Sequence, residues 1–439
     1  MGKISSEGLP MELLSNSDFM SNISNTLPNG WTIRNPVVQS ARCSFEFSSK
    51  GISVSSSKNP YSFGSIYQEI KNIKGGCAYL IKANARINKI RFPYRSIFVA
   101  VSWRKGDSVI NNAGLLVKGP YVEGDSAKFE DVLIAPKEVD NAIISLEVRW
   151  IDDGIVTWQN ASMIQTDVPP PREAKIGTVY LRPSTGSQEK NLELWCEQID
   201  NAGKLGLDIV CLCEAITMVG TSFNALECAR PIPGEHTDII SRSAKKNNIW
   251  VVAGLMELAD DKVYNTAVLF NRNGDIAGTY HKVHLPGEEW KWGITPGTEY
   301  PVFKTDFGTI AMQICYDWFF PETATIFAMN GAEIIFAPTW GNTLPDHDGI
   351  ADGETVFRVR ARDNGVYMVP SVYDGNSMVI DPVGRILASS KGQTGVFWAE
   401  VDLNVREALD WVGHWRSLVH RNRMPETYSK LLTYPQVFI

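Results

Sequence analysis

Three side chains suited to nucleophilic chemistry stand directly after apolar runs of the chain. These are the carboxylate of Glu214, the ammonium of Lys282 and the thiol of Cys315. The runs before them are short and rich in β-branched residues, which favours buried strands. In α/β sheets, residues at strand ends gather around a common crevice. We therefore predict that a base, a cation and a nucleophile meet at one site, although they lie far apart in sequence.

The residues after Cys315 indicate a tight turn into a helix. Pro321-Glu322 suits a first helical turn, because proline tolerates that position and a carboxylate complements the positive helix end. A thiol close to unpaired helix N–H groups tends to ionise, and a neighbouring ammonium lowers its pKa further. We therefore expect Cys315 to react as a thiolate.

The elements that must position these residues begin near Lys175, where strands alternate with helices. Asn273-Gly274 marks a hairpin turn, and a second hairpin surrounds residues 381–384. Buried strands are predicted at 176–181, 207–213, 249–254, 309–314, 332–338 and 366–370, and helices at 191–203, 237–247 and 358–364. This order predicts an α/β fold with two layers of strands between helices.

The chain before this region predicts a separate all-β domain. Residues 1–166 hold short alternating runs separated by Gly, Asn, Ser and Pro clusters, as in sandwiches. Residues 167–174, with three consecutive prolines, form a stiff connector to a second domain at 175–439. The first domain weakly resembles the jelly-roll sandwiches of carbohydrate-binding modules. Trp31, Trp103, Trp150 and Trp158 suggest either a platform for a glycan or, more commonly, buried core.

Residues 175–439 resemble the nitrilase superfamily of carbon–nitrogen hydrolases, whose signature is a Glu-Lys-Cys triad. The matching segments follow in order: Pro231-Ile-Pro-Gly234, Tyr264-Asn265, Tyr280-His-Lys-Val-His-Leu-Pro286, Thr295-Pro-Gly297, Cys315-Tyr-Asp317, Arg360-Ala-Arg-Asp-Asn364, Asp381-Pro-Val-Gly384 and Arg423-Met-Pro-Glu-Thr-Tyr428. The resemblance implies an αββα four-layer sandwich, commonly paired as a homodimer. Cys213 stands where the family often has proline, and Ser371 where it often has Asn.

The family resemblance also implies a role for each site residue. Glu214 would be the general base, Cys315 the nucleophile, and Lys282 with the backbone N–H of Tyr316 would stabilise the oxyanion. A second acid is expected between Lys282 and Thr295; Glu289 fits best, and Glu288 remains the alternative.

Composition and motifs argue against several other kinds of protein, including nucleic-acid-binding, membrane and metal-dependent proteins. The net charge of −7 and the lack of a Lys/Arg run argue against a nucleic-acid partner. Seven cysteines without framework spacing, and a start without a signal peptide, indicate a cytoplasmic protein with free thiols and no membrane span. His281 and His284 lack metal-ligand company, so neither a metal nor another cofactor is expected. On a strand, His281 points away from Lys282, which disfavours a Cys/His mechanism.

The sequence favours one reaction and leaves others open. Cys315-Tyr-Asp resembles the amidase and carbamoylase branches, which predicts hydrolysis of a linear amide or N-carbamoyl compound. The alternatives are a nitrilase proper, an acyltransferase with the same triad, and a non-catalytic glycan-binding fusion. Arg358, Arg360 and Arg362 suggest carboxylate recognition or, more commonly, helix salt bridges or a dimer contact. The aromatic candidates for an apolar substrate pocket are Trp290, Trp318, Trp340 and Tyr373, with Trp292 and Phe319 beside them.

Overall fold

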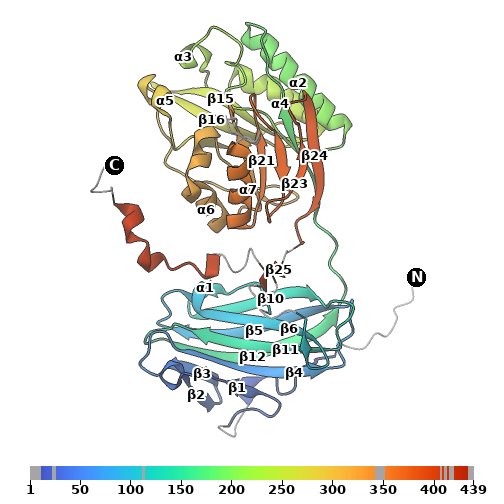
Figure 1. The fold of residues 1–439 in the computed structure, drawn as a ribbon, viewed down its shortest axis with the longest axis vertical. Coiled ribbons are helices and arrows are strands. Elements are labelled where there is room, and N and C mark those ends of the chain that lie inside the picture. The colour runs from blue at the N-terminus through green and yellow to red at the C-terminus, as the bar shows by residue number, and fades with distance from the viewer. Residues whose placement is uncertain are drawn as a thin grey trace, which may run out of the picture. The chain divides into compact units, whose positions relative to one another are not determined.

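The computed structural model describes residues 11–21, 26–110, 114–341, 352–405, 408–409, 413–414 and 420–433. The chain divides into two compact units (Figure 1). The first unit comprises residues 1–170 together with 408–439, and the second comprises residues 171–407. Among the described residues, no helix is both long and apolar enough to cross a membrane.

The first unit is a β-sandwich of two antiparallel sheets, as its alternating sequence pattern predicts. One sheet has the order β1(Thr32–Arg34)-β4(Phe63–Lys71)-β11(Asn141–Arg149)-β6(Ile97–Lys105)-β7(Ser108–Val109), with β8(Leu115–Leu116) also paired to β6. The other has the order β2(Cys43–Ser48)-β3(Gly51–Ser56)-β12(Ile155–Thr166)-β5(Ala78–Asn88)-β10(Ser126–Ile134)-β9(Tyr121–Glu123). A short helix, α1(Pro93–Ser96), precedes β6.

Three of the four tryptophans considered for a glycan platform lie in the core of this sandwich. Trp31, Trp103 and Trp158 are at most 5% exposed and pack within one apolar cluster. Trp150 is half-buried, and the guanidinium of Arg149 lies 4.7 Å from its ring centroid. The three buried rings stabilise the sandwich core, in accord with the core interpretation of these tryptophans.

The described C-terminal residues belong to the first unit. The Arg421 side chain is 2% exposed and donates to the carbonyl of Gly119. Arg149 donates to the Asn422 side chain over 2.7 Å, and Arg95 forms an ion pair with Glu426. This corrects the sequence-based domain boundary, which placed everything up to residue 439 with the α/β domain. The contacts that join the C-terminal residues to the first unit are ion pairs and a buried guanidinium. Such contacts produce no periodic apolar pattern, so the sequence did not predict them.

The second unit has two six-stranded mixed sheets between helices (Figure 1). The first sheet has the order β17(Ile276–His281)-β16(Lys262–Phe270)-β15(Trp250–Ala259)-β14(Ile209–Cys211)-β13(Glu173–Tyr180)-β24(Gly395–Asp402). The second has the order β18(Phe303–Lys304)-β19(Thr309–Met312)-β20(Ile334–Pro338)-β21(Tyr367–Ser371)-β22(Met378–Ile380)-β23(Ile386–Ser389). Helices α2(Gln188–Lys204) and α4(Glu235–Asn247) cover the first sheet, and α6(Pro321–Met329) and α7(Asp352–Asn364) cover the second. The predicted four-layer α/β fold is therefore confirmed.

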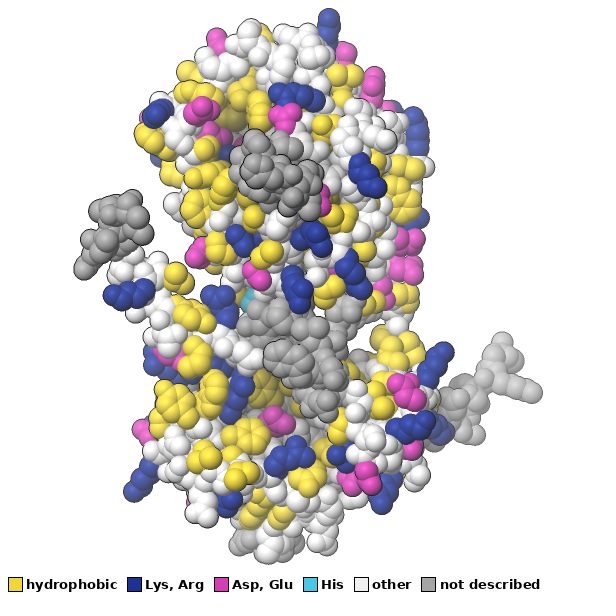
Figure 2. All heavy atoms as spheres, viewed as in Figure 1, with side chains coloured by type: hydrophobic (Ala, Val, Ile, Leu, Met, Phe, Trp, Pro, Cys, Tyr) yellow, Lys and Arg dark blue, Asp and Glu magenta, His cyan; other side chains and the backbone are white. Residues whose placement is uncertain are grey.

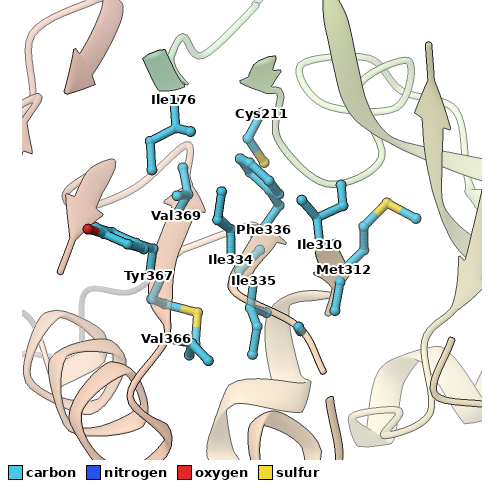
Figure 3. Close-up of a cluster of buried hydrophobic side chains, with 14 of the residues drawn as sticks. Ile176, Cys211, Ile310, Met312, Ile334, Ile335, Phe336, Val366, Tyr367 and Val369 are labelled. Carbon is cyan, nitrogen blue, oxygen red and sulfur yellow. The ribbon is translucent and has the colours of Figure 1, made fainter. Parts of the chain in front are cut away.

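The space between the two sheets is filled by apolar side chains from both. Figure 3 shows Ile176 and Cys211 of the first sheet facing Ile334, Phe336 and Val369 of the second. Each of these five side chains is fully buried. Burial on both faces explains why the strands read as continuous apolar runs and not as alternating patterns.

Charged side chains of both signs are interspersed over the visible face of each unit (Figure 2).

Candidate active site

The directions of the strands bring the predicted residues to one edge of the second unit. Strands β13, β14 and β15 run parallel, and two antiparallel reversals return β17 to the same direction. The carboxyl ends of β14 and β17 therefore share one edge, where Glu214 and Lys282 follow them. Cys315 follows β19 of the facing sheet.

Lys282 joins the carboxylates at the centre of this site. Its Nζ donates to Oε1 of Glu214 over 2.8 Å and to Oε1 of Glu289 over 3.0 Å. Glu289 lies on the short helix α5(Gly287–Lys291), whereas the neighbouring Glu288 is exposed to solvent. The geometry thus brings Glu289, the first choice of the sequence analysis, to the ammonium.

A hydrogen bond from another strand end fixes the backbone at Glu214. Glu214 is 3% exposed, and its carbonyl accepts a hydrogen bond from the hydroxyl of Tyr373. The next residue, Ala215, has a φ of +46°, in the left-handed region that residues with a Cβ seldom adopt. The surrounding contacts therefore fix a strained turn that directs the carboxyl group of Glu214 toward Lys282.

Cys315 occupies a comparable turn. Its φ is +41°, and it begins the 3₁₀ helix η3(Cys315–Phe319), which leads into α6. The Glu214 carboxyl group, the Lys282 ammonium and the backbone of Trp340 lie near enough to shift the pKa of the Cys315 thiol. Tyr316 follows in the first turn of η3, where N–H groups have no partner within the helix. Glu214, Lys282 and Cys315, the three residues that the sequence analysis singled out, therefore lie close together.

Asp317 ties the Cys315 turn to the segment that carries Lys282. Its Oδ2 accepts from the hydroxyl of Tyr280 over 2.8 Å and from the N–H of Ile314 over 2.9 Å. Its Oδ1 accepts the backbone N–H of His284 over 3.0 Å and lies 2.9 Å from Nδ1 of the same residue. Because Asp317 is fully buried, these contacts replace its hydration and fix the two segments together.

We expect Asp317→Asn to lower the free energy of unfolding of the second unit by about 3 kcal/mol, since hydrogen bonds to a buried charge are strong and an amide cannot accept at both ends. Urea unfolding with a parallel activity assay measures this. Asp363→Asn, at a half-exposed carboxylate on α7, is the matched control and should change little. Equal unfolding midpoints for both variants would contradict the role given to Asp317.

Burial and neighbouring charges shift the pKa values of Lys282 and Glu289. Burial alone would lower the pKa of Lys282, but Glu214, Cys315 and Glu289 outweigh it and raise this pKa above its ordinary value. Burial raises the pKa of Glu289, and the nearby Glu214 carboxylate adds to the rise, while Lys282 opposes it. Lys282 therefore stays protonated throughout the physiological range.

The pKa of the Cys315 thiol is shifted against the direction that the sequence predicts. Burial and the facing Glu214 carboxylate raise this pKa above its usual range, more than Lys282 and the Trp340 backbone lower it. The surroundings therefore favour the neutral thiol over the thiolate.

The aromatic residues proposed for a substrate pocket divide into two groups. Tyr373 and Trp318 are at most 4% exposed and pack in the apolar clusters. Their rings are therefore part of the core and are not open to a substrate. Trp340 is half-buried, beside the nucleophile through its backbone N–H, and Trp290 is 57% exposed directly after Glu289. Substrate contact by Trp340 and Trp290 stays a prediction, whereas the Tyr373 hydroxyl holds the backbone of Glu214.

The histidines beside Lys282 have structural partners. His281 lies 2.9 Å from Oε2 of Glu257 and stacks on Tyr264, on the strand face opposite Lys282, as the alternation of a strand requires. His284 is held by Asp317 and stacks on Phe320. Within the described ranges, no three His, Cys, Asp or Glu side chains are grouped to hold a metal.

The arginines of α7 contact the backbone of their own unit. Arg358 donates to the carbonyl of Gly384 over 2.9 Å, and Arg360 donates to that of Phe319 over 3.4 Å. These contacts favour the structural interpretation of α7 over recognition of a substrate carboxylate.

Sequence reasoning gave no role to two residues that the structure places at this site. Asp317 and Asn265 were noted only as parts of matching segments. The available signal was their position: Asp317 lies two residues after Cys315, and Asn265 stands directly before the apolar run of residues 266–270. Their partners come from other elements, so their contacts appear only in the folded chain.

The sequence matches one protein-family model and several known amidases. Residues 175–410 match the family model described as carbon-nitrogen hydrolase. The chain is 32% identical over 233 residues to an omega-amidase of Xenopus laevis, covering 48% of this chain and 83% of that protein. It is 28% identical over 274 residues to deaminated glutathione amidase of Mus musculus, covering 56% and 83%.

Solved structures show the same fold. A carbon-nitrogen hydrolase from Helicobacter pylori superposes with a TM-score of 0.51 at 23% identity, covering 60% of this chain and 99% of that one. An amidase variant from Nesterenkonia sp. superposes with a TM-score of 0.50 at 19% identity, covering 60% and 99%; its structure carries the acetamide moiety of fluoroacetamide covalently at the active-site cysteine.

Proposed function

Because this chain belongs to the carbon-nitrogen hydrolase family of the nitrilase superfamily, we propose that it hydrolyses a linear amide or N-carbamoyl compound through a thioester on Cys315. The observation that carries this proposal is the convergence of Lys282 on Glu214 and Glu289 beside the Cys315 thiol. The relatives named above are amidases, and the cysteine of the Nesterenkonia sp. amidase accepts an acetamide group.

The geometry gives each residue a step in the proposed reaction. Glu214 accepts the thiol proton while Sγ of Cys315 attacks the carbonyl carbon. Lys282 Nζ and the Tyr316 N–H stabilise the oxyanion, each by about 3–4 kcal/mol. The C–N bond then breaks, and Glu214 returns the proton to the departing nitrogen, which leaves as ammonia or an amine.

The second half of the reaction restores the enzyme. Water attacks the thioester carbonyl and Glu214 accepts its proton. The C–S bond breaks, the carboxylic acid leaves, and the sulfur regains a proton. Throughout both halves, Glu289 would keep Lys282 aligned and protonated, in accord with its hydrogen bond and with the raised pKa of Lys282.

The polar atoms of the site favour an amide over a nitrile. Oε2 of Glu214, Oε2 of Glu289 and Oδ1 of Asn265 are buried and accept no hydrogen bond from nitrogen or oxygen within the described residues. An amide nitrogen brings N–H donors for such acceptors, whereas a nitrile brings none. A site built to hydrogen-bond a substrate group rejects analogues that lack it by up to about 10⁴–10⁵-fold.

We expect the protein to release ammonia from a primary amide at least about 10³-fold faster than it consumes the nitrile of the same acyl group. Paired assays of several amides, N-carbamoyl compounds and nitriles measure this ratio. Carbon dioxide release separates N-carbamoyl hydrolysis from simple amide hydrolysis, and added hydroxylamine reveals acyl transfer. Faster consumption of the nitriles would assign the site to a nitrilase instead.

A further inference from the structure

The side chain of Asn265, on β16, reaches both carboxylates. It is 2% exposed, and its Nδ2 donates to Oε1 of Glu214 over 2.7 Å and to Oε1 of Glu289 over 2.8 Å. Its backbone carbonyl accepts the N–H of Lys282 over 2.9 Å. A single residue thus contacts the base, the second acid and the cation.

Chemistry fixes the orientation of this amide. An ionised carboxylate only accepts hydrogen bonds, so the group facing two carboxylate oxygens must be the NH₂, which has one hydrogen for each. The reverse orientation would set three oxygens against one another. The amide and the Lys282 ammonium therefore bridge the same pair of oxygens from two sides.

The charge at the site explains why such a bridge matters. Two carboxylates share one ammonium in a buried place, and like charges this close favour uptake of a proton. The groups that face the pair are Lys282 after β17, the Cys315 thiol of η3 and Asn265 itself. Of these, Asn265 alone supplies hydrogen bonds to both carboxylates without adding a charge.

We infer that Asn265 is a positioning residue that holds Glu214 and Glu289 side by side as carboxylates, so that Glu214 remains free to take the thiol proton. This role deepens the proposed hydrolase function and rests on it. The amide acts through Glu214. Burial and the nearby Glu214 carboxylate already raise the pKa of Glu289, while Lys282 and Asn265 lower it. Loss of the two donated hydrogen bonds should therefore move the titration of the pair to higher pH.

The test is Asn265→Asp, which replaces the NH₂ donor by a further carboxyl oxygen at equal size. Asn273→Asp is the matched control, because it makes the same charge change at the exposed turn between β16 and β17, where Asp-Gly is also favourable. Asn265→Ser is a second variant that keeps one short donor and adds no charge. Urea unfolding midpoints confirm that all three variants are folded at the assay temperature.

Two pH profiles are measured for each variant: kcat/KM for a primary amide, and the rate of Cys315 alkylation by iodoacetamide, followed by intact mass. For Asn265→Asp we expect the acid limb of both profiles to move up by at least about one pH unit, which lowers the rate on that limb by about tenfold. Asn265→Ser should move in the same direction by less, and Asn273→Asp should match the wild type.

The outcomes separate this inference from the proposed function. If wild type hydrolyses no amide, the proposed function fails, while the alkylation profile still reports on Asn265. If both profiles of Asn265→Asp superimpose on those of wild type, the positioning role is overturned. A uniform loss of rate with an unshifted limb also overturns it, because a merely structural contribution would act in that way.

Discussion

Cys315→Ala is expected to abolish amide hydrolysis, with kcat falling by about 10⁶-fold, because a triad without its nucleophile retains almost none of its acceleration. Stability should change little, since alanine keeps the Cβ atom of Cys315 and removes only the sulfur. Intact-mass spectrometry during turnover should detect an acyl adduct on wild type and none on the variant. The mass of that adduct would also identify the acyl group of the substrate.

Cys196→Ala is the matched control for the nucleophile. Cys196 lies half-buried on α2, away from the site edge. Burial raises the pKa of its thiol. The control should keep both turnover and the acyl adduct. An adduct that persists in Cys315→Ala, or that is lost in Cys196→Ala, would transfer the nucleophile to another residue and refute the proposed mechanism.

Lys282→Met should damage both chemistry and stability. Loss of one oxyanion donor costs about 10²–10³ in kcat. The two carboxylates would also lose the cation between them, and breaking a buried ion pair from one side destabilises by about 3–5 kcal/mol. Part of this cost is relieved when the pair takes up a proton, so the acid limb of the activity profile should also move to higher pH.

Lys291→Met separates these effects from the general loss of a charge. Lys291 ends α5, the helix that carries Glu289, and its side chain is exposed. Urea unfolding and amide hydrolysis should be within error of wild type for this variant. Retention of activity within tenfold in Lys282→Met would remove Lys282 from the oxyanion site and leave it a structural ion pair.

The elements that carry the site were accessible from sequence because their patterns are local. Asn273-Gly274 forms the predicted hairpin between β16 and β17, and Pro321 stands at the first position of α6 as expected. Strand β15 extends to Ala259, beyond the predicted end at Gly254, since its pairing with β16 continues there. Pairing between strands adds residues that no single-strand pattern indicates.

The sequence by itself determined the identity of the reactive groups and the order of strands and helices, because residue type and periodic burial are properties of short segments. Only the tertiary structure decided which groups touch. It placed Asn265 between Glu214 and Glu289, set the Cys315 thiol beside Glu214, which raises the pKa of that thiol, and folded Arg421 against the sandwich. Each of these depends on distances between segments far apart in the chain, and on the exclusion of water that their packing creates.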